Sequence, residues 1–420
     1  MQQIKNKRNQ YIVIREKQDQ DSSVDANPAA SFKLEFKKFI DSCTEPVAFL
    51  QAYEMGEVFR LQGIQYARFM VKSREEEEPL ATAVVRYYPK FRLFKEAWIT
   101  HGPVFKSGLS SAEIAAISAA LRQEIFREAK VISMLLTPYY NYEQFSDLPK
   151  MMEAENFKDE GRELDMTNVN HLYIKNLDDY QDIEEIVASY SGNLRRAITK
   201  SDYYGVRIKD LPDSELSHFF KILEDTAERK EFFIQEESYF RAMRKAFGKR
   251  AKLMLGQLDL EHYRKVQKAE KAELEAELEE NKQKTGKRAR GKEKECAERI
   301  KAVTRRLDEA GEYPSDQNLV DLCALFCVEF GGEITTVFGG RYRRFNAVEG
   351  NSILNHRLLE EAFDKAYKRF NFYGTLEIEE AKQGIGNYEF KKSFAGETII
   401  LVGKFTAEKG PAKILARLKK

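Results

Sequence analysis

The chain has 420 residues, with 69 Lys and Arg against 68 Asp and Glu, which leaves a formal net charge of +1. At roughly 100–200 residues per domain, this length predicts about two to four domains. The apolar share of 42% is enough for a sizeable core. Because the charge is balanced, a uniformly basic nucleic-acid-binding protein is excluded, and any surface for a polyanion must be local.

Missing patterns exclude several further classes of protein. No apolar run reaches the roughly 20 residues of a membrane-spanning helix, and residues 1–30 lack the apolar stretch of a secretory signal. The four Cys and the isolated His residues show no metal-binding or disulfide-framework spacing, so we expect no metal site and a reducing compartment. The motifs GxxxxGKS/T and GxSxG are absent, which disfavours a P-loop nucleotidase and a serine hydrolase.

Helix-like and strand-like stretches alternate after the polar segment 1–30, which we expect to be flexible. In the first half the predicted helices are 32–43, 49–63 and 110–129, and the predicted strands are 66–72, 81–88, 98–105 and 131–136. In the second half the predicted helices are 183–190, 194–203, 216–228, 239–247 and 352–368, and the predicted strands are 172–174, 206–209, 251–258, 319–329, 333–338, 370–373 and 399–405. This mixture predicts an α/β (α+β) protein of two units, 31–165 and 166–420.

A helical hairpin is predicted to interrupt the second unit between residues 259 and 312. The stretch 260–310 has no Pro and is dominated by Glu, Lys, Ala and Arg. On the return arm the apolar residues step by 4, 3, 4 and 3, which is the spacing of a coiled-coil seam: Cys296, Ile300, Val303, Leu307 and Ala310. Lys and Arg cluster between the arms, at Lys287, Arg288, Arg290 and Lys292. One interpretation of this cluster is a contact with RNA or an anionic membrane, and the other is a solvated turn.

Glycines and basic residues are densest in the C-terminal part of the second unit. Arg341, Arg343 and Arg344 follow a Gly-Gly pair, and Lys391 and Lys392 follow a phenylalanine. Glycines at such positions let a backbone turn sharply or approach a ligand. On composition alone, the alternative to a functional site here is a set of basic surface loops with no catalytic or binding role.

The order of several motifs resembles the FemABX peptidyltransferase family. NFYGTL (371–376), GNYEFKKSFAG (386–396) and VGKF (402–405) are similar to the C-terminal signature of that family. FLQAYEMGEV (49–58), ITHGPV (99–104), LRRAITKSDYYGVRI (194–208) and TAERKEFF (226–233) are similar to its earlier segments, in the same order. The resemblance covers roughly residues 45–405. NFYG and the hairpin place the chain nearest the FemA/FemB and MurM/MurN branch.

This resemblance implies two tandem acetyltransferase-like (GNAT-type) units with an antiparallel coiled-coil arm inserted in the second. It also implies an aminoacyltransferase that moves an amino acid from aminoacyl-tRNA to a peptidoglycan precursor, commonly lipid II. The acceptor would be the side-chain amine of the stem peptide or the growing bridge. Aminoacyl-tRNA is then a co-substrate, and we expect no cofactor. The implied location is cytoplasmic, with peripheral contact at the inner face of the cell membrane as a further option.

The resemblance also assigns candidate roles to single residues. By motif register Lys391 is the cationic donor that stabilises the oxyanion of the transfer, and Lys392 is the alternate. If this segment is a strand, the two side chains point to opposite faces, so only one can enter a cleft. Arg229 matches a position implicated in binding the acceptor phosphate. The further candidate substrate contacts are Phe390, Tyr373 and Met55, the last standing where many members carry an aromatic residue.

Three alternatives stay open at this point. A basic-tipped coiled coil on an aromatic-rich body also suits an RNA-binding or scaffold protein without transferase activity. An acyl-CoA-dependent N-acyltransferase would keep the fold and change the donor. The nearest match to its pyrophosphate loop, (R/Q)xxGx(G/A), is AKQGIG at 381–386, which lacks the initial Arg or Gln. For Arg229 the alternative is a surface ion pair with Glu228 or Glu231.

Overall fold

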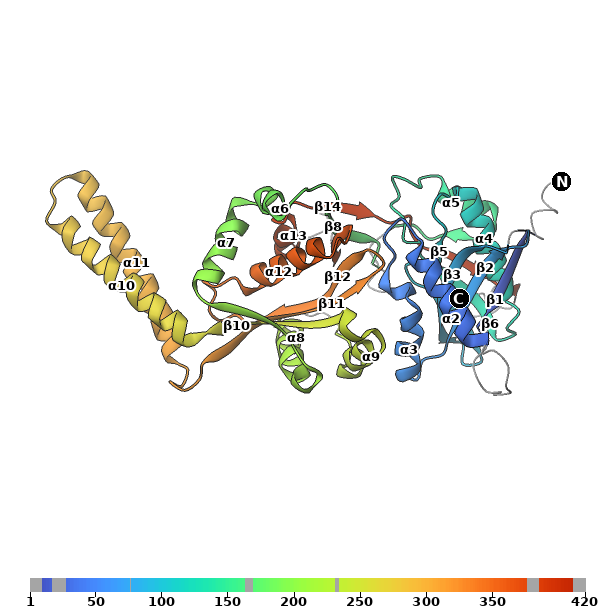
Figure 1. Cartoon of the computed structure of the whole chain (residues 1–420), viewed down its shortest axis with the longest axis horizontal. Coiled ribbons are helices and arrows are strands. Elements are labelled where there is room, and N and C mark those ends of the chain that lie inside the picture. The colour runs from blue at the N-terminus through green and yellow to red at the C-terminus, as the bar shows by residue number, and fades with distance from the viewer. Residues whose placement is uncertain are drawn as a thin grey trace.

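The computed structural model describes residues 10–16, 28–75, 77–162, 169–230, 234–375 and 385–410. These residues form two α/β units and a helical hairpin that lie in a row, with the second unit between the hairpin and the first unit (Figure 1). Each unit is built on one mixed sheet. This arrangement confirms the predicted α/β fold of two tandem units with an inserted antiparallel helical hairpin.

The first sheet has the strand order β1-β2-β3-β4-β6-β15-β7, with β5 paired to β3. Among the pairings of its described strands, only that of β4 with β6 is parallel. All six residues of β6 are buried, as expected for a strand in the middle of a covered sheet. The bounds are β1 Tyr11–Arg15, β2 Tyr66–Ser73, β3 Pro79–Lys90, β4 Phe94–Ile99, β5 Val104–Phe105, β6 Val131–Leu136, β7 Lys158–Asp159 and β15 Phe405–Glu408.

The helices α4 (Ser111–Ile125) and α5 (Leu148–Ala154) pack on this first sheet. α4 begins at a capping box, because the Ser110 side chain accepts from the Glu113 N–H and the Glu113 carboxylate accepts from the Ser110 N–H.

The second sheet has the order β14-β8-β13-β12-β11-β10-β9, and among its described pairings only β12 with β13 is parallel. That pairing runs from Glu333–Arg369 to Thr335–Asn371. β11 and β12 form a hairpin through Gly331 and Gly332, whose positive φ angles suit a tight turn. The bounds are β8 His171–Asn176, β9 Val206–Asp210, β10 Ala251–Asp259, β11 Leu319–Phe330, β12 Glu333–Arg341, β13 Arg369–Gly374 and β14 Glu397–Ile400.

Helices cover both faces of the second sheet (Figure 1). One face carries α6 (Ile183–Ser189), α7 (Gly192–Tyr203), α12 (Gly350–Asp364) and α13 (Ile385–Lys392). The other face carries α8 (Leu216–Lys230) and α9 (Glu237–Phe247), with short 3-10 turns at Asp213–Glu215 and Gly248–Arg250.

The two units share one hydrophobic core. α2 (Pro28–Asp41), the 3-10 turn Phe49–Gln51 and α3 (Tyr53–Leu61) contribute side chains from the first unit. α8, α9 and the inner strands of the second sheet contribute the rest, including Phe219, Phe240 and Phe326. Because the core is continuous, the two units are packed together rather than joined by a free linker.

The predicted hairpin is present as α10 (Leu260–Lys282) and α11 (Lys287–Gly311). Its seam is mostly apolar, with Tyr263, Leu274, Cys296, Val303 and Ala310 buried, and it also buries the polar Gln267 and Asn281. Its base is tied to the end of α7, because Arg306 Nη1 donates to the Tyr204 hydroxyl at 3.0 Å. Arg306 Nη2 pairs with Glu270 of the other arm at 3.2 Å. The arm therefore leaves the body at a direction fixed by polar contacts.

Among the segments that differ from the prediction, two change the composition of the first sheet. Tyr11–Arg15 forms edge strand β1, within the segment that we expected to be flexible, because it adds to β2 from Tyr11–Ser73 to Arg15–Phe69. The stretch predicted as one strand, 399–405, is divided between the two sheets. Gly403, at φ 109°, turns the chain, and β15 then enters the first sheet between β6 and β7. Residues 405–408 thus belong to the first sheet and not to the unit 166–420.

Candidate functional site

Lys391 is a buried lysine without a carboxylate partner among the described residues. Its side chain lies on α13, and the residue is only 7% exposed. Its Nζ donates to the carbonyl oxygen of Gly374 and, at 3.4 Å, to that of Tyr373. Lys392 is exposed. The segment is a helix and not the strand considered above, so the two lysines separate because successive helical side chains project about 100° apart.

Burial lowers the pKa of the Lys391 ammonium from 10.5 to about 7. Removing a cation from water disfavours its charged form, and here only two carbonyl dipoles offset that loss. The side chain is therefore close to half-protonated at neutral pH. A lysine in this state can present a cationic hydrogen-bond donor in a site with little water.

The backbone that receives Lys391 departs from regular strand geometry. β13 shifts its register against β8 between Asn371 and Gly374, which is the signature of a bulge. Tyr373 within this bulge has a φ of 62°, in the left-handed region. Asn371 Oδ1 accepts from the Tyr373 N–H at 2.7 Å, so the turn is closed by a side chain two residues earlier.

A buried carboxylate lies next to this turn and connects the two units. Glu333, 1% exposed, receives the Arg369 guanidinium at 2.7 and 2.8 Å on Oε2. Its Oε1 accepts from the Tyr139 hydroxyl at 3.0 Å, from Thr335 Oγ1 at 2.9 Å and from Asn371 Nδ2 at 3.2 Å. Tyr139 follows β6 of the first unit, whereas the other groups belong to β12 and β13. We refer to these five residues as the Glu333 network.

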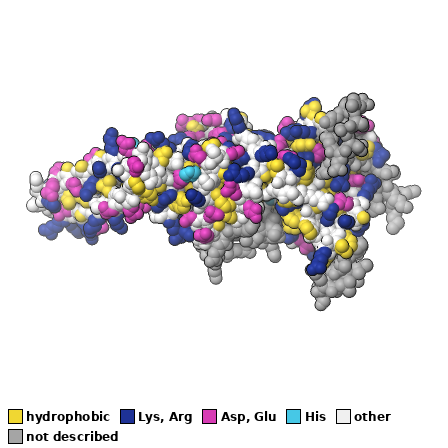
Figure 2. All heavy atoms as spheres, turned by 90° about the horizontal axis from the view of Figure 1, so that it is seen from below, with side chains coloured by type: hydrophobic (Ala, Val, Ile, Leu, Met, Phe, Trp, Pro, Cys, Tyr) yellow, Lys and Arg dark blue, Asp and Glu magenta, His cyan; other side chains and the backbone are white. Residues whose placement is uncertain are grey.

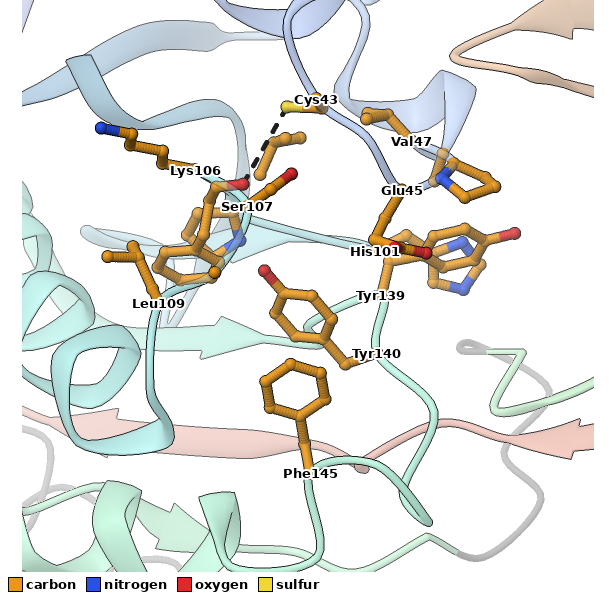
Figure 3. A pocket seen from close by; sticks show the side chains of 16 residues that line it. Cys43, Glu45, Val47, His101, Lys106, Ser107, Leu109, Tyr139, Tyr140 and Phe145 are labelled. Atoms are coloured by element: carbon orange, nitrogen blue, oxygen red, sulfur yellow. Dashed lines mark hydrogen bonds between the residues drawn. The ribbon is translucent and has the colours of Figure 1, made fainter. Parts of the chain in front are cut away.

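A pocket of about 70 Å³ lies on the first-unit side of the Glu333 network (Figure 3). His101 and Tyr139 line it, and their rings lie 5.1 Å apart. Tyr140 and Phe145 point into it, with ring centroids 4.3 Å apart. Burial raises the pKa of the Cys43 thiol in its wall to about 11, so this thiol stays protonated and is a poor nucleophile. The pocket is mostly apolar, and the polar side chains of Glu45, His101, Lys106 and Ser107 also line it.

The structure places two of the predicted substrate contacts at Lys391 and the third elsewhere. Tyr373 supplies a carbonyl to the lysine, and Phe390 precedes it on α13, half-buried against Phe394. Met55 is 1% exposed in the shared core, among α2, α8 and α9. A substrate contact at Met55 stays a prediction. The loop match at 381–384 lies outside the described residues.

Arg229 lies at the end of α8, among other cations. Its Nε pairs with Asp225 at 3.1 Å, and its Nη2 donates to the carbonyl of Arg341 at 2.6 Å. The predicted alternative partner Glu228 is not the one used, and Glu231 is outside the described residues. Burial and the nearby charges of Arg229, Arg341 and Arg343 lower the pKa of the Lys230 ammonium. A group of cations that repel one another is a surface suited to a polyvalent anion.

The predicted tip residues lie at the far end of the hairpin, away from Lys391 (Figure 1). Lys287, Arg288, Arg290 and Lys292 are all exposed, and none has an ion-pair partner within the described ranges. Figure 2 shows both signs of charge interspersed over the visible face of the hairpin. The tip is therefore a local cluster of cations on an arm of mixed charge.

The site contains residues that the sequence patterns did not identify. Asn371 lies within the NFYG motif, which marks the segment without revealing what the amide does. Glu333 directly follows the Gly-Gly turn, and Tyr139 lies 194 residues before it. No local pattern connects the two. Within the described residues no helix is long and apolar enough to cross a membrane, and no group of three or more His, Cys, Asp or Glu could hold a metal ion.

Comparisons with known proteins identify similar chains. The model of the FemAB family matches residues 31–420. Aminoacyltransferase FemA of Staphylococcus epidermidis (strain ATCC 35984) is 21% identical over 393 residues, which cover 88% of this chain and 93% of that protein. FemA of Staphylococcus aureus (strain MRSA252) is 24% identical over 229 residues, or 53% of this chain and 54% of that protein. The crystal structure of FemX covers 92% of this chain and 98% of its own, with a TM-score of 0.72 and 19% identity, which shows a common fold.

The low pKa of Lys391 predicts a pH-dependent contribution to stability. A lysine in the unfolded chain titrates near 10.5 and Lys391 near 7, so unfolding takes up a proton between these values. Raising the pH from about 7 to about 9 should therefore stabilise the wild type relative to Lys391→Met, by up to about 1.4 kcal/mol per pH unit. Urea unfolding of both proteins measures this difference. Lys392→Met, an exposed control, should show no such trend; a pH-independent difference for Lys391→Met would mean that its pKa is ordinary.

Proposed function

Because the chain belongs to the FemAB family, we propose that it is an aminoacyltransferase that uses aminoacyl-tRNA as donor and a peptidoglycan precursor as acceptor. The similarity to FemA over most of both chains supports the enzyme class, which forms an amide bond. The single observation that carries the chemistry is Lys391, a buried lysine of low pKa without a carboxylate partner within the described residues, in the motif segment GNYEFKKSFAG.

The reaction needs placement and charge stabilisation more than covalent catalysis. The acceptor amine attacks the carbonyl of the aminoacyl ester, a C–N bond forms, and the C–O bond to the terminal ribose breaks. The amine loses a proton and the ribose oxygen gains one, and a hydroxyl of that ribose is the group we propose to relay it. No covalent enzyme intermediate is required, because the ester is already activated, and we name no protein base, because the ribose hydroxyl is proposed to relay the proton. The enzyme must hold the two groups about 3 Å apart and stabilise the oxyanion between the steps.

Lys391 is the group that we propose to stabilise that oxyanion. An ammonium has three N–H donors, and two of them are directed at the Tyr373 and Gly374 carbonyls. The third donor is then held in a fixed direction. Because the side chain is buried, its interaction with a developing negative charge is screened little by water. Phe390 and Tyr373 flank it as proposed substrate contacts.

The proposed acceptor is lipid-linked, such as lipid II, and so presents a pyrophosphate at the cytoplasmic membrane face. Arg229 with Lys230, Arg341 and Arg343 is the cationic group suited to it. The contact of Arg229 with the Arg341 carbonyl holds α8 against the end of β12 and keeps these side chains together. The exposed tip of the hairpin is the proposed contact with tRNA or the membrane surface. The enzyme would act in the cytoplasm, with peripheral contact at the membrane.

The proposal that aminoacyl-tRNA is the donor is tested by destroying the tRNA. Transfer of a labelled amino acid to lipid II should stop after ribonuclease treatment of the aminoacyl-tRNA. It should also weaken steeply as salt is raised, since cationic contacts with phosphates release counterions. Acyl-CoA as donor should give no product. Ribonuclease-resistant transfer from acyl-CoA would favour the N-acyltransferase, and tRNA binding without any transfer would favour the scaffold protein.

Replacing the proposed oxyanion donor tests the mechanism. Lys391→Met keeps most of the apolar stem and removes the charge, so kcat should fall by about 10²–10³, as for the loss of one oxyanion donor. The KM values of both substrates should stay within several-fold, because the contact forms in the transition state. Lys392→Met, which alters an exposed neighbour, should be mild. Single-turnover transfer at the wild-type rate in Lys391→Met would exclude this role.

Reversing the charge of the tip tests the arm. Replacing Lys287, Arg288, Arg290 and Lys292 by Glu should weaken binding to tRNA or to anionic vesicles by about tenfold or more, because each lost phosphate contact lowers affinity. The melting temperature should change little, since these side chains are exposed. A matched control reverses four exposed cations of the shaft: Lys265, Lys268, Lys301 and Arg305. If the tip variant and the wild type bind tRNA and anionic vesicles equally well, the tip is only a solvated turn.

A further inference from the structure

The carbonyls that receive Lys391 are held by a conformation that needs support. Tyr373 is a bulky residue with a φ of 62°, which such a residue adopts only where its surroundings hold it. The bulge between Asn371 and Gly374 directs both carbonyls at the Lys391 Nζ. If the bulge relaxed to a regular strand, successive carbonyls would alternate in direction, and the lysine would lose one of its two acceptors.

The Asn371 amide closes this bulge, and its orientation is determined by its partners. Its Oδ1 accepts from the Tyr373 N–H at 2.7 Å. Its Nδ2 donates to the Tyr139 hydroxyl at 2.8 Å and to Glu333 Oε1 at 3.2 Å. A flipped amide would place an oxygen against the Glu333 carboxylate and an N–H against the Tyr373 N–H, so only one orientation satisfies all three contacts. The side chain is fully buried.

The first unit reaches the same amide through Tyr139. The Tyr139 hydroxyl donates to Glu333 and accepts from Asn371, so it locks the amide from the opposite side of the boundary between the units. The His101 ring, also from the first unit, lies 5.1 Å from the Tyr139 ring and 6.2 Å from the Tyr373 ring. The position of the first unit is thereby connected, by three consecutive hydrogen bonds, to the Lys391 Nζ.

We propose that Asn371 is a positioning residue for the transfer reaction, which holds the Tyr373 and Gly374 carbonyls on Lys391 and is itself locked by Tyr139 of the first unit. Asn371 contacts no reacting atom, and it acts through the direction of the remaining Lys391 N–H. This inference rests on the proposed oxyanion role of Lys391. It follows that the two units must be docked for the lysine to be directed correctly.

Thr335 provides a matched control within the same network. Its hydroxyl donates to Glu333 Oε1 at 2.9 Å, as Tyr139 does, and the residue is 2% exposed. Thr335 is the cross-strand neighbour of Asn371, but the Asn371 amide and the Tyr373 N–H make their hydrogen bonds to other groups. Thr335→Val keeps the side-chain shape and removes one donor to the carboxylate. A variant that only loosens the network should therefore behave like Thr335→Val.

The test is a double-mutant cycle between Asn371→Ala and Lys391→Met, with aminoacyl-tRNA and lipid II as substrates and single-turnover rates as the readout. Alone, Asn371→Ala should lower kcat about tenfold, with both KM values within about threefold. In the Lys391→Met background the same change should alter the residual rate by less than twofold, because the residue through which it acts is gone. Thr335→Val should change kcat less than twofold, although it lowers the melting temperature.

The outcomes separate this inference from the proposed function. Suppose that Lys391→Met transfers slowly and that adding Asn371→Ala to it lowers the single-turnover rate by a further tenfold. Asn371 is then only structural, and the positioning role is overturned. The same holds if Thr335→Val slows kcat as much as Asn371→Ala. If Lys391→Met retains the wild-type rate, the proposed catalytic role fails, and this inference with it.

A milder variant keeps the test usable if Asn371→Ala does not fold. Tyr139→Phe keeps the ring beside His101 and removes only the hydroxyl that locks the amide. It should lower kcat about threefold in the wild-type background and not at all in Lys391→Met. An equal loss in both backgrounds would overturn the link between the first unit and the lysine.

Discussion

The arrangement around Lys391 depends on the burial of one carboxylate, that of Glu333. A charge taken out of water is tolerated only if nearly all its hydrogen-bonding capacity is used, and removing one partner of a buried ion pair typically costs about 3–5 kcal/mol. Arg369, Thr335, Asn371 and Tyr139 together meet this requirement. These groups come from both units. The hydrogen-bonding requirement of the Glu333 carboxylate therefore fixes how the units dock and how the backbone runs from Asn371 to Gly374.

A second feature of the described structure is a set of cations without carboxylate partners. The chain is nearly neutral overall, but many exposed lysines and arginines form no ion pair within the described residues, Lys265, Lys268 and Arg305 among them. Lys391, the cations Lys230, Arg341 and Arg343, and the tip of the hairpin are three such places, although Arg229 beside Lys230 pairs with Asp225. Each suits a different anionic feature of the proposed substrates: a transient oxyanion, a pyrophosphate, and an extended phosphate backbone or lipid surface. Local charge, and not net charge, therefore carries the binding argument.

The two units are less independent than their similar architecture suggests. Each sheet has one parallel strand pair, yet the cores meet across α3 and α9, and β15 returns from the end of the second unit to the first sheet. Such crossings restrict the relative motion of the units. A restricted boundary is consistent with a site whose lysine is oriented by contacts from both sides.

The sequence by itself determined the elements and the family. Heptad spacing predicted the hairpin, and motif order indicated Lys391, because these signals are local and follow the order of the chain. It could not indicate that Met55 faces the core, that 405–408 joins the first sheet, or that the lysine segment is a helix. Nor could it join Tyr139 to Glu333 across 194 residues. Only the tertiary structure decided these points. A buried charge is stabilised by whichever groups lie next to it in space, and such neighbours leave no periodic pattern in the sequence.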